Sequence, residues 1–233
     1  MNPWISIWLQ PRQTIRQIVD TNPKRFVLLL AIGAGIADVL MKTLPLAFQE
    51  KIHLPLVVAA LIGLVGGSLF GILALYLFGW LYRWTGNWLG GQATAVETRA
   101  AIAWTQIPSV WLFGLWLMLL AASGGDLLKA AEKQAGMTPV AAIFSILFGL
   151  ASIVIGVWQF VIVCRGVAEV HRFSGWKGFG SVVITQSLFL VPIAIIGILA
   201  AIAIPNFIRA RDAARARMES VPAPAAVVDT KGP

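Results

Sequence analysis

The sequence predicts an all-α membrane protein: a bundle of five transmembrane helices with a short interfacial amphipathic helix at the N-terminus. Composition is the first observation, because the 233 residues are 58% hydrophobic and only 12% charged, with a mean hydropathy of +0.82. Soluble domains carry about 25% charged residues. The second observation is a set of five apolar stretches that approach the ~20 residues a helix needs to cross the hydrocarbon core.

The N-terminal segment, residues 1–25, is expected to form a short cytoplasmic helix. Ile15 and Ile18 fall on one face of that helix, and Arg12 and Arg16 are among its polar positions. This pattern is typical of helices that lie in the membrane interface. Two tryptophans would anchor the helix there, Trp4 and Trp8. The alternative is a helix that packs on the ends of the bundle.

The membrane domain, residues 26–207, holds the five expected spans. They run approximately over residues 26–45, 54–80, 101–123, 140–163 and 182–204. No internal repeat is convincing, which argues against a transporter built from inverted repeats. The remaining residues, 208–233, are basic and then rich in proline and alanine, and we expect them to be largely disordered.

Lysine and arginine in the loops predict the orientation in the membrane. With the N-terminus in the cytoplasm, nine of the 18 Lys and Arg residues lie inside, four lie outside and five belong to the C-terminal tail. Because early spans usually dominate, we expect a multi-pass protein of the cytoplasmic (inner) membrane with its N-terminus inside and its C-terminus outside. The net charge of +8 is then explained by basic residues in the cytoplasmic loops, which attract anionic lipid, and nucleic acid is not expected as a partner.

Small residues at four-residue spacing mark helix faces that can pack closely in lipid. The second span has such a face, and the fourth and fifth spans have shorter ones. The glycines concerned are Gly63, Gly67, Gly71, Gly149, Gly156 and Gly197. These faces predict either packing within the bundle or the seam of a homo-oligomer.

Asp38 stands out within the first span, because a charge inside a membrane is costly. Lys42 follows four residues later, so the two side chains can pair on one helix face. The alternative is a coupling carboxylate in a small transporter or channel. Pro108 interrupts the third span, but kinks are common in membrane helices and need not mark a site.

No pattern of residues predicts catalysis or a bound metal or cofactor. Cys164 is the only cysteine, and His171, seven residues further on, lies in a loop. This spacing matches neither a metal site nor a nucleophile with its base. We therefore expect a non-enzymatic protein without a cofactor.

Two cytoplasmic connectors are the most distinctive stretches of the chain. In the first, a double glycine predicts a turn, and Glu97 follows Thr94 at the spacing of a capping box. The second reads CRGVAEVHRFSGWKGFG, residues 164–180. Candidate functional residues in and beside the two connectors are Gly90, Gly91, Glu97, Arg99, Pro108, Glu169 and Arg172.

These connectors resemble those of the bacterial branch of the YIP family, the Yip-domain, Ypt/Rab-interacting membrane proteins. From Tyr82 to Pro108, a double glycine precedes a short polar helix, an arginine and a proline-containing span, as in that family. The opening WLQPR and the run GVAEVHRFSGWKG are similar too. The resemblance implies a five-span bundle with a cytoplasmic N-terminus and no catalytic activity. Eukaryotic members are associated with small trafficking GTPases and membrane shaping, but their long N-terminal region has no counterpart here, so GTPase binding is not expected.

A second resemblance lies near the C-terminus, where residues 194–211 are similar to the N-terminal helix of a type IV pilin around Ile-Pro-Asn-Phe. The cleavage glycine of a pilin would fall at Val183, and its essential glutamate at Leu188. Neither processing nor polymerisation is therefore expected. In a pilin the chain after this helix lies outside, which implies the orientation given above.

Together these features predict a membrane scaffold or membrane-organising component that acts through helix packing and its cytoplasmic connectors. Its expected partners are the lipid bilayer, anionic lipid at the basic loops, a second copy of the chain and other membrane proteins. One alternative is a small-solute transporter or channel that uses Asp38. Another is an accessory to pilus or secretion machinery.

Overall fold

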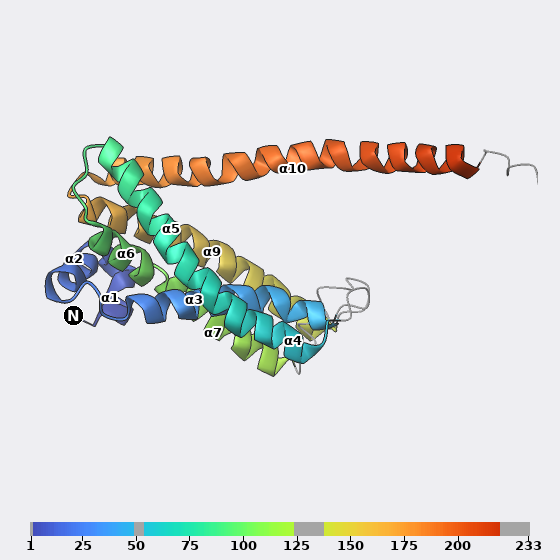
Figure 1. The fold of residues 1–233 in the computed structure, drawn as a ribbon. Helices are drawn as coiled ribbons and strands as arrows, with labels where there is room; N and C mark the ends of the chain where they lie inside the picture. Colours follow the sequence, from blue (N-terminus) through green and yellow to red (C-terminus); the bar gives the residue numbers. More distant parts are fainter. Residues whose placement is uncertain (1, 49–53, 124–137, 220–233) are drawn as a thin grey trace, which may run out of the picture. The chain divides into compact units, whose positions relative to one another are not determined.

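The computed structural model describes residues 2–48, 54–123 and 138–219 (Figure 1). The elements in these ranges are all helical: α1 (Pro3–Leu9), α2 (Pro11–Thr21), α3 (Val27–Thr43), a 3₁₀ turn η1 (Pro45–Phe48), α4 (Leu56–Leu61), a π-helical turn η2 (Ile62–Gly66), α5 (Gly67–Trp88), α6 (Ala95–Trp104), α7 (Ile107–Ala122), α9 (Pro139–Val170) and α10 (Gly175–Glu219). The predicted all-α fold is therefore confirmed.

Within the described residues, five helical segments are long and apolar enough to cross a membrane, as predicted. They are Val27–Ala47, Leu56–Trp88, Ala95–Ala122, Pro139–Val170 and Gly175–Arg215. The third span is not one helix, because α6 ends at Trp104 and α7 begins at Ile107 with Pro108 in its first turn. Proline suits that position, since its missing N–H would have no partner there.

The chain divides into two units, residues 1–185 and 186–233. The second unit contains the C-terminal part of α10, which continues as helix to Glu219. The membrane domain was expected to end at residue 207, so the helix extends beyond that boundary. Alanine and arginine dominate residues 209–217, and both favour helix, whereas the boundary had been placed where the apolar residues end. The rest of the expected disordered tail, residues 220–233, lies outside the described residues.

Glycines bring α3 and α5 into direct backbone contact. A Cβ atom on Gly35 of α3 would collide with the carbonyl oxygen of Gly67 and lie 2.6 Å from the Cα atom of Gly71. A Cβ atom on Gly71 would collide with the carbonyl oxygen of Ala31. The glycine face of the second span thus lies against α3 of the same chain, as close small-residue packing in lipid requires.

The other predicted packing glycines have different surroundings. A Cβ atom on Gly63 would collide with the side chain of Leu40 in α3. On α9, a Cβ atom at Gly149 or Gly156 would meet no described atom within 4 Å. Gly197 belongs to the second unit, where a Cβ atom would meet no described atom of that unit within 4 Å. At these three glycines of α9 and α10, no described residue of the same unit packs closely.

The N-terminal segment forms two helices that pack on one end of the bundle. Ile7 of α1 and Ile15 of α2 are fully buried, and Ile18 is 5% exposed. They belong to one core with Trp104 of α6 and Ile162 of α9. Of the two interpretations left open by the sequence, packing on the end of the bundle accounts for the apolar face of α2.

Candidate functional site

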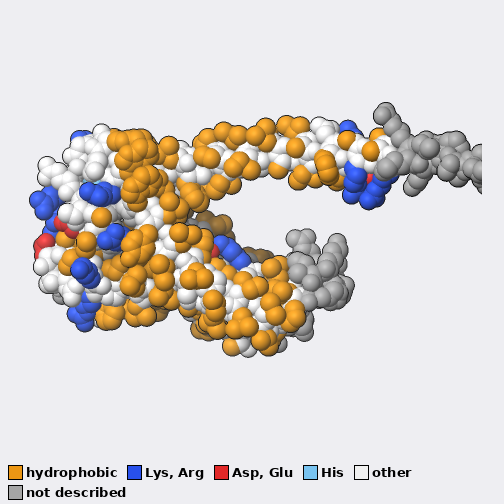
Figure 2. Space-filling model, viewed as in Figure 1, with side chains coloured by type: hydrophobic (Ala, Val, Ile, Leu, Met, Phe, Trp, Pro, Cys, Tyr) orange, Lys and Arg blue, Asp and Glu red, His pale blue; other side chains and the backbone are white. Residues whose placement is uncertain are grey.

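One end of the first unit carries most of the basic side chains that the structure describes in that unit. We call this end the cap and define it as α1, α2, α6, the connectors 22–26, 89–94 and 171–174, and the adjoining residues 83–88, 165–170 and 175–177. Figure 2 shows Lys and Arg side chains gathered over this end, whereas hydrophobic side chains cover most of the visible surface of the spans. This distribution fits a lipid-embedded bundle with one end at the membrane surface.

An ion-pair cluster holds α2 to the end of α9. The Arg16 guanidinium donates from Nε to Glu169 Oε1 and from Nη2 to the Glu169 backbone carbonyl, both at 2.9 Å. Arg12 approaches the second carboxylate oxygen of Glu169 at 3.8 Å and donates from Nη2 to the Phe173 carbonyl at 2.9 Å. Arg16 also lies 4.0 Å from Asp20. The contacts of Arg12 and Arg16 with Glu169 and Phe173 join segments more than 150 residues apart.

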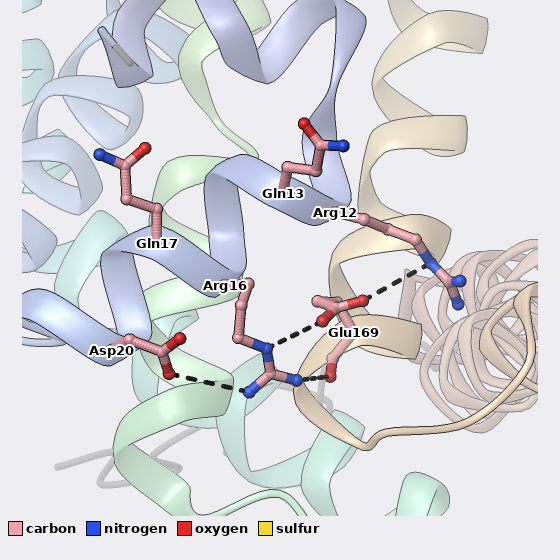
Figure 3. A pocket seen from close by; sticks show the side chains of 6 residues that line it. All are labelled: Arg12, Gln13, Arg16, Gln17, Asp20 and Glu169. Carbon is pink, nitrogen blue, oxygen red and sulfur yellow. Dashed lines mark hydrogen bonds and ion pairs between the residues drawn. The ribbon is translucent and has the colours of Figure 1, made fainter.

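The same residues line an open pocket of about 350 Å³. Figure 3 shows Arg12 and Arg16 converging on Glu169, while Gln13 and Gln17 point away from it on the outer side of α2. The Glu169 side chain is 21% exposed and that of Arg16 is 30% exposed. Because the carboxylate neutralises the guanidinium charge that faces it, this cluster is suited to fixing α2 in place.

A second set of contacts joins the two connectors. Gly90 has φ +84°, which only glycine adopts without strain. A Cβ atom on the neighbouring Gly91 would collide with the imidazole of His171. Lys177 of α10 donates to the Leu89 carbonyl at 3.0 Å. The double glycine predicted as a turn therefore also makes room for a histidine from the other connector.

Three further candidate residues lie on α6 and at its borders. Thr94 and Glu97 form the predicted capping box: Glu97 Oε2 accepts from the Thr94 N–H at 2.7 Å, and Thr94 Oγ1 accepts from the Glu97 N–H at 3.3 Å. The Arg99 guanidinium lies over the Tyr76 ring, 5.1 Å from its centroid. Pro108 is buried in the first turn of α7. Arg99 thus packs α6 against α5, whereas the capping box fixes the start of α6 itself.

The remaining candidates are placed differently. Arg172 follows the C-cap residue of α9 with φ +57° and is exposed. Asp38 pairs with Lys42 at 2.7 Å, as predicted, with side-chain exposures of 41% and 70%. This pair lies in the C-terminal half of α3, whereas the cap lies at the N-terminal end of that helix (Figure 1). The structure therefore does not bring Asp38 together with the candidates of the connectors.

Sequence reasoning missed a buried hydroxyl cluster. Thr85 Oγ1 of α5 lies 2.9 Å from Ser181 Oγ and 2.8 Å from Thr185 Oγ1, and all three residues are fully buried. Hydrogen bonding satisfies these groups in an apolar setting and fixes the start of α10 against α5. The signal in the sequence was two hydroxyls four residues apart on one helix, but it did not indicate a partner about 100 residues away.

These features define a five-span helical membrane protein whose cap is held by side chains from distant segments. In the described residues, no three His, Cys, Asp or Glu side chains are grouped so that they could hold a metal ion. A family model, the Yip1 domain, matches residues 5–198, and the chain belongs to that family. This confirms the resemblance to the YIP family and makes the chain an integral membrane protein, whereas the bacterial branch and the pilin-like segment stay predictions. Neither the curated proteins nor the solved structures gave a match.

Proposed function

We propose that this chain is a non-enzymatic membrane-organising protein that acts through helix packing and a basic cap that recruits anionic lipid. One observation carries the proposal: the cap exposes an excess of positive charge. The exposed basic residues at this end are Lys24, Arg25, Arg83, Arg165, Arg172 and Lys177, whereas Asp20 is the exposed acidic residue among the described residues there.

The physical basis is the surface potential of an anionic leaflet. Each Lys or Arg near such a surface contributes about 1 kcal/mol of attraction. Arg16 and Arg12 form ion pairs with Glu169, so the carboxylate partly neutralises their positive charge. The exposed cations remain available to lipid headgroups. A cap of this kind would concentrate anionic lipid around the bundle, so the lipids bound to the protein would depend on the anionic lipid content of its leaflet.

The test compares lipid selectivity in reconstituted membranes. We expect spin-labelled phosphatidylglycerol to associate with the full chain several-fold more strongly than spin-labelled phosphatidylcholine. Replacing Lys24, Arg25, Arg83 and Arg172 together by glutamine should remove most of that preference. The matched control replaces Arg209, Arg211 and Arg215 by glutamine in the second unit. A quadruple variant that keeps the full preference would contradict the proposal.

The proposal includes an orientation: the N-terminus and the cap in the cytoplasm, the C-terminus outside, and the inner membrane as the location. An odd number of spans supports opposite sides for the two ends, and the basic cap favours the cytoplasm. A reporter that is active only outside the cytoplasm, fused after Pro233, should be active, and a cytoplasm-only reporter at the same place should be silent. The reverse result would contradict the orientation.

The proposal also assigns the open glycines of α9 to contact with a second copy of the chain. Gly149 and Gly156 support this, because no described atom lies near the positions of their missing Cβ atoms. Asp38 already has an ion-pair partner in Lys42, which explains the carboxylate without transport. Neither a transporter nor a pilus accessory is favoured by a specific contact in the described residues.

A further inference from the structure

His171 is a buried polar residue that the proposed function does not use. Its side chain is 1% exposed, and neither ring nitrogen has a hydrogen-bond partner within the described residues. An unsatisfied buried polar group destabilises the folded state, because it has lost its hydrogen bonds to water. Phenylalanine or leucine would fill the same space without that cost, so the presence of a histidine calls for an explanation.

The space around the ring is reserved for it by glycine. A Cβ atom on Gly86 of α5 would collide with the ring atoms Cε1 and Nε2, and one on Gly91 would collide with Nδ1. Phe173 stacks on the imidazole with the ring centroids 5.2 Å apart and the planes 14° from parallel. The imidazole is thus held in a slot made by α5, the first connector and the second connector.

This slot is where the two connectors meet. The Gln92 N–H donates to the His171 carbonyl at 3.4 Å, and Lys177 donates to the Leu89 carbonyl beside it. The side chain of Phe173 stacks on the ring, and its backbone carbonyl accepts a hydrogen bond from Arg12 of α2. Displacing the imidazole would therefore disturb the connectors and the attachment of α2 together.

The slot suits a neutral imidazole and not a charged one. The pKa of His171 is lowered, mainly by burial and also by the positive charge of Arg83 in α5. The backbone carbonyl of Tyr82 and the Glu97 carboxylate of α6 act in the opposite direction. The Tyr82 carbonyl lacks the geometry of a hydrogen bond to the ring. Lys177 of α10 is a second cation beside the connectors. Burial thus outweighs the groups that favour the protonated form.

The sign of the pH effect follows from that lowered pKa. Above the ordinary histidine pKa of ~6.5, the ring is neutral in both the folded and the unfolded state, and the slot contributes its full stability. As the pH falls below ~6.5, the unfolded or opened state takes up a proton that the closed slot resists. Stability of the closed cap is therefore lost on acidification.

We propose that His171 is a pH-sensitive latch, whose neutral ring holds the two connectors of the cap together and whose protonation releases them. The latch goes beyond lipid recruitment, because it makes the arrangement of the cap depend on the pH on its own side of the membrane. The step is the uptake of one proton from water by the unprotonated ring nitrogen, which forms an N–H bond and leaves the ring with one positive charge.

Hydrogen exchange on the full chain in lipid nanodiscs tests the latch. Exchange would be measured at about pH 7.5 and about pH 5.5, one unit on either side of the ordinary histidine pKa, and corrected for the intrinsic effect of pH on exchange. Peptides covering residues 86–92 and 168–174 should lose up to about tenfold in protection at the lower pH, the most that one titrating histidine can contribute over this interval. Unchanged protection in the wild-type chain would overturn the latch.

Variants separate His171 from other titrating groups. His171→Phe and His171→Leu do not titrate, so the corrected protection of both peptides should become independent of pH. His53→Gln, at the other histidine of the chain, should behave like the wild type. Gly91→Ala pushes a methyl group into the slot and should give low protection at both pH values. A pH effect that persists in both His171 variants, or full protection in Gly91→Ala, would refute the mechanism.

Discussion

Gly71→Ala is expected to destabilise the protein by about 3 kcal/mol, at the upper end of what overpacking of a core costs. The added methyl group would collide with the carbonyl oxygen of Ala31 and crowd the Cα atom of Gly35, 3.2 Å away. Both obstacles are backbone atoms, so no side chain can rotate to make room. The helices α3 and α5 must separate, and close van der Waals packing is what holds helices together in lipid.

Gly66→Ala is the matched control, because it places the same methyl group five residues earlier in the same span. There a Cβ atom would meet only the end of the Ile62 side chain, at 3.8 Å. Alanine favours helix over glycine by about 1 kcal/mol, so this variant should be neutral or slightly stabilised. Thermal unfolding of both variants in detergent would measure the opposite signs. Equal stability of the two would mean that α3 and α5 do not touch at Gly71.

The glycine contacts illustrate how far sequence reasoning extends in this fold. The spacing of Gly63, Gly67 and Gly71 identifies a helix face, because periodicity along one helix is local information. The residues that contact Gly67 and Gly71 on that face include Gly35 and Ala31 of the first span. The spacing of the second span alone does not predict which helix packs there. Apolar length and the Thr94–Glu97 capping box are local in the same way, which explains why the spans and the start of α6 could be predicted.

The cap depended on contacts that sequence reasoning could not predict. Arg12 and Arg16 read as polar positions of an interfacial helix, and Glu169 as one charge in a connector. Their pairing across more than 150 residues requires the fold. His171 was dismissed for lack of a catalytic or metal spacing, but burial against two glycines is what distinguishes it. The boundary at residue 207 followed hydrophobicity, whereas helix formation continues wherever the residues favour it.

Glu169→Ala is the second large effect, with an expected loss of about 2–3 kcal/mol, as for hydrogen bonds to charged groups. The carboxylate accepts from Arg16 at 2.9 Å and faces Arg12 at 3.8 Å. Its removal leaves the Arg16 guanidinium, only 30% exposed, without the charge that compensates its burial. Attachment of α2 should weaken first, so protease cleavage within residues 3–21 should speed up before the spans unfold.

A double-mutant cycle with Arg16→Ala decides whether the pair itself is responsible. Residues in direct contact couple, so the double variant should be less destabilised than the sum of the two single variants by about 1–2 kcal/mol. Asp38→Asn is the matched control, because it also breaks an ion pair on a helix, but one whose side chains are 41% and 70% exposed. That pair joins residues four apart on α3 and holds no second element, so its loss should not speed cleavage within residues 3–21. Additive effects at Arg16 and Glu169, or faster cleavage in Asp38→Asn, would show that this ion pair is not what fixes α2 to the bundle.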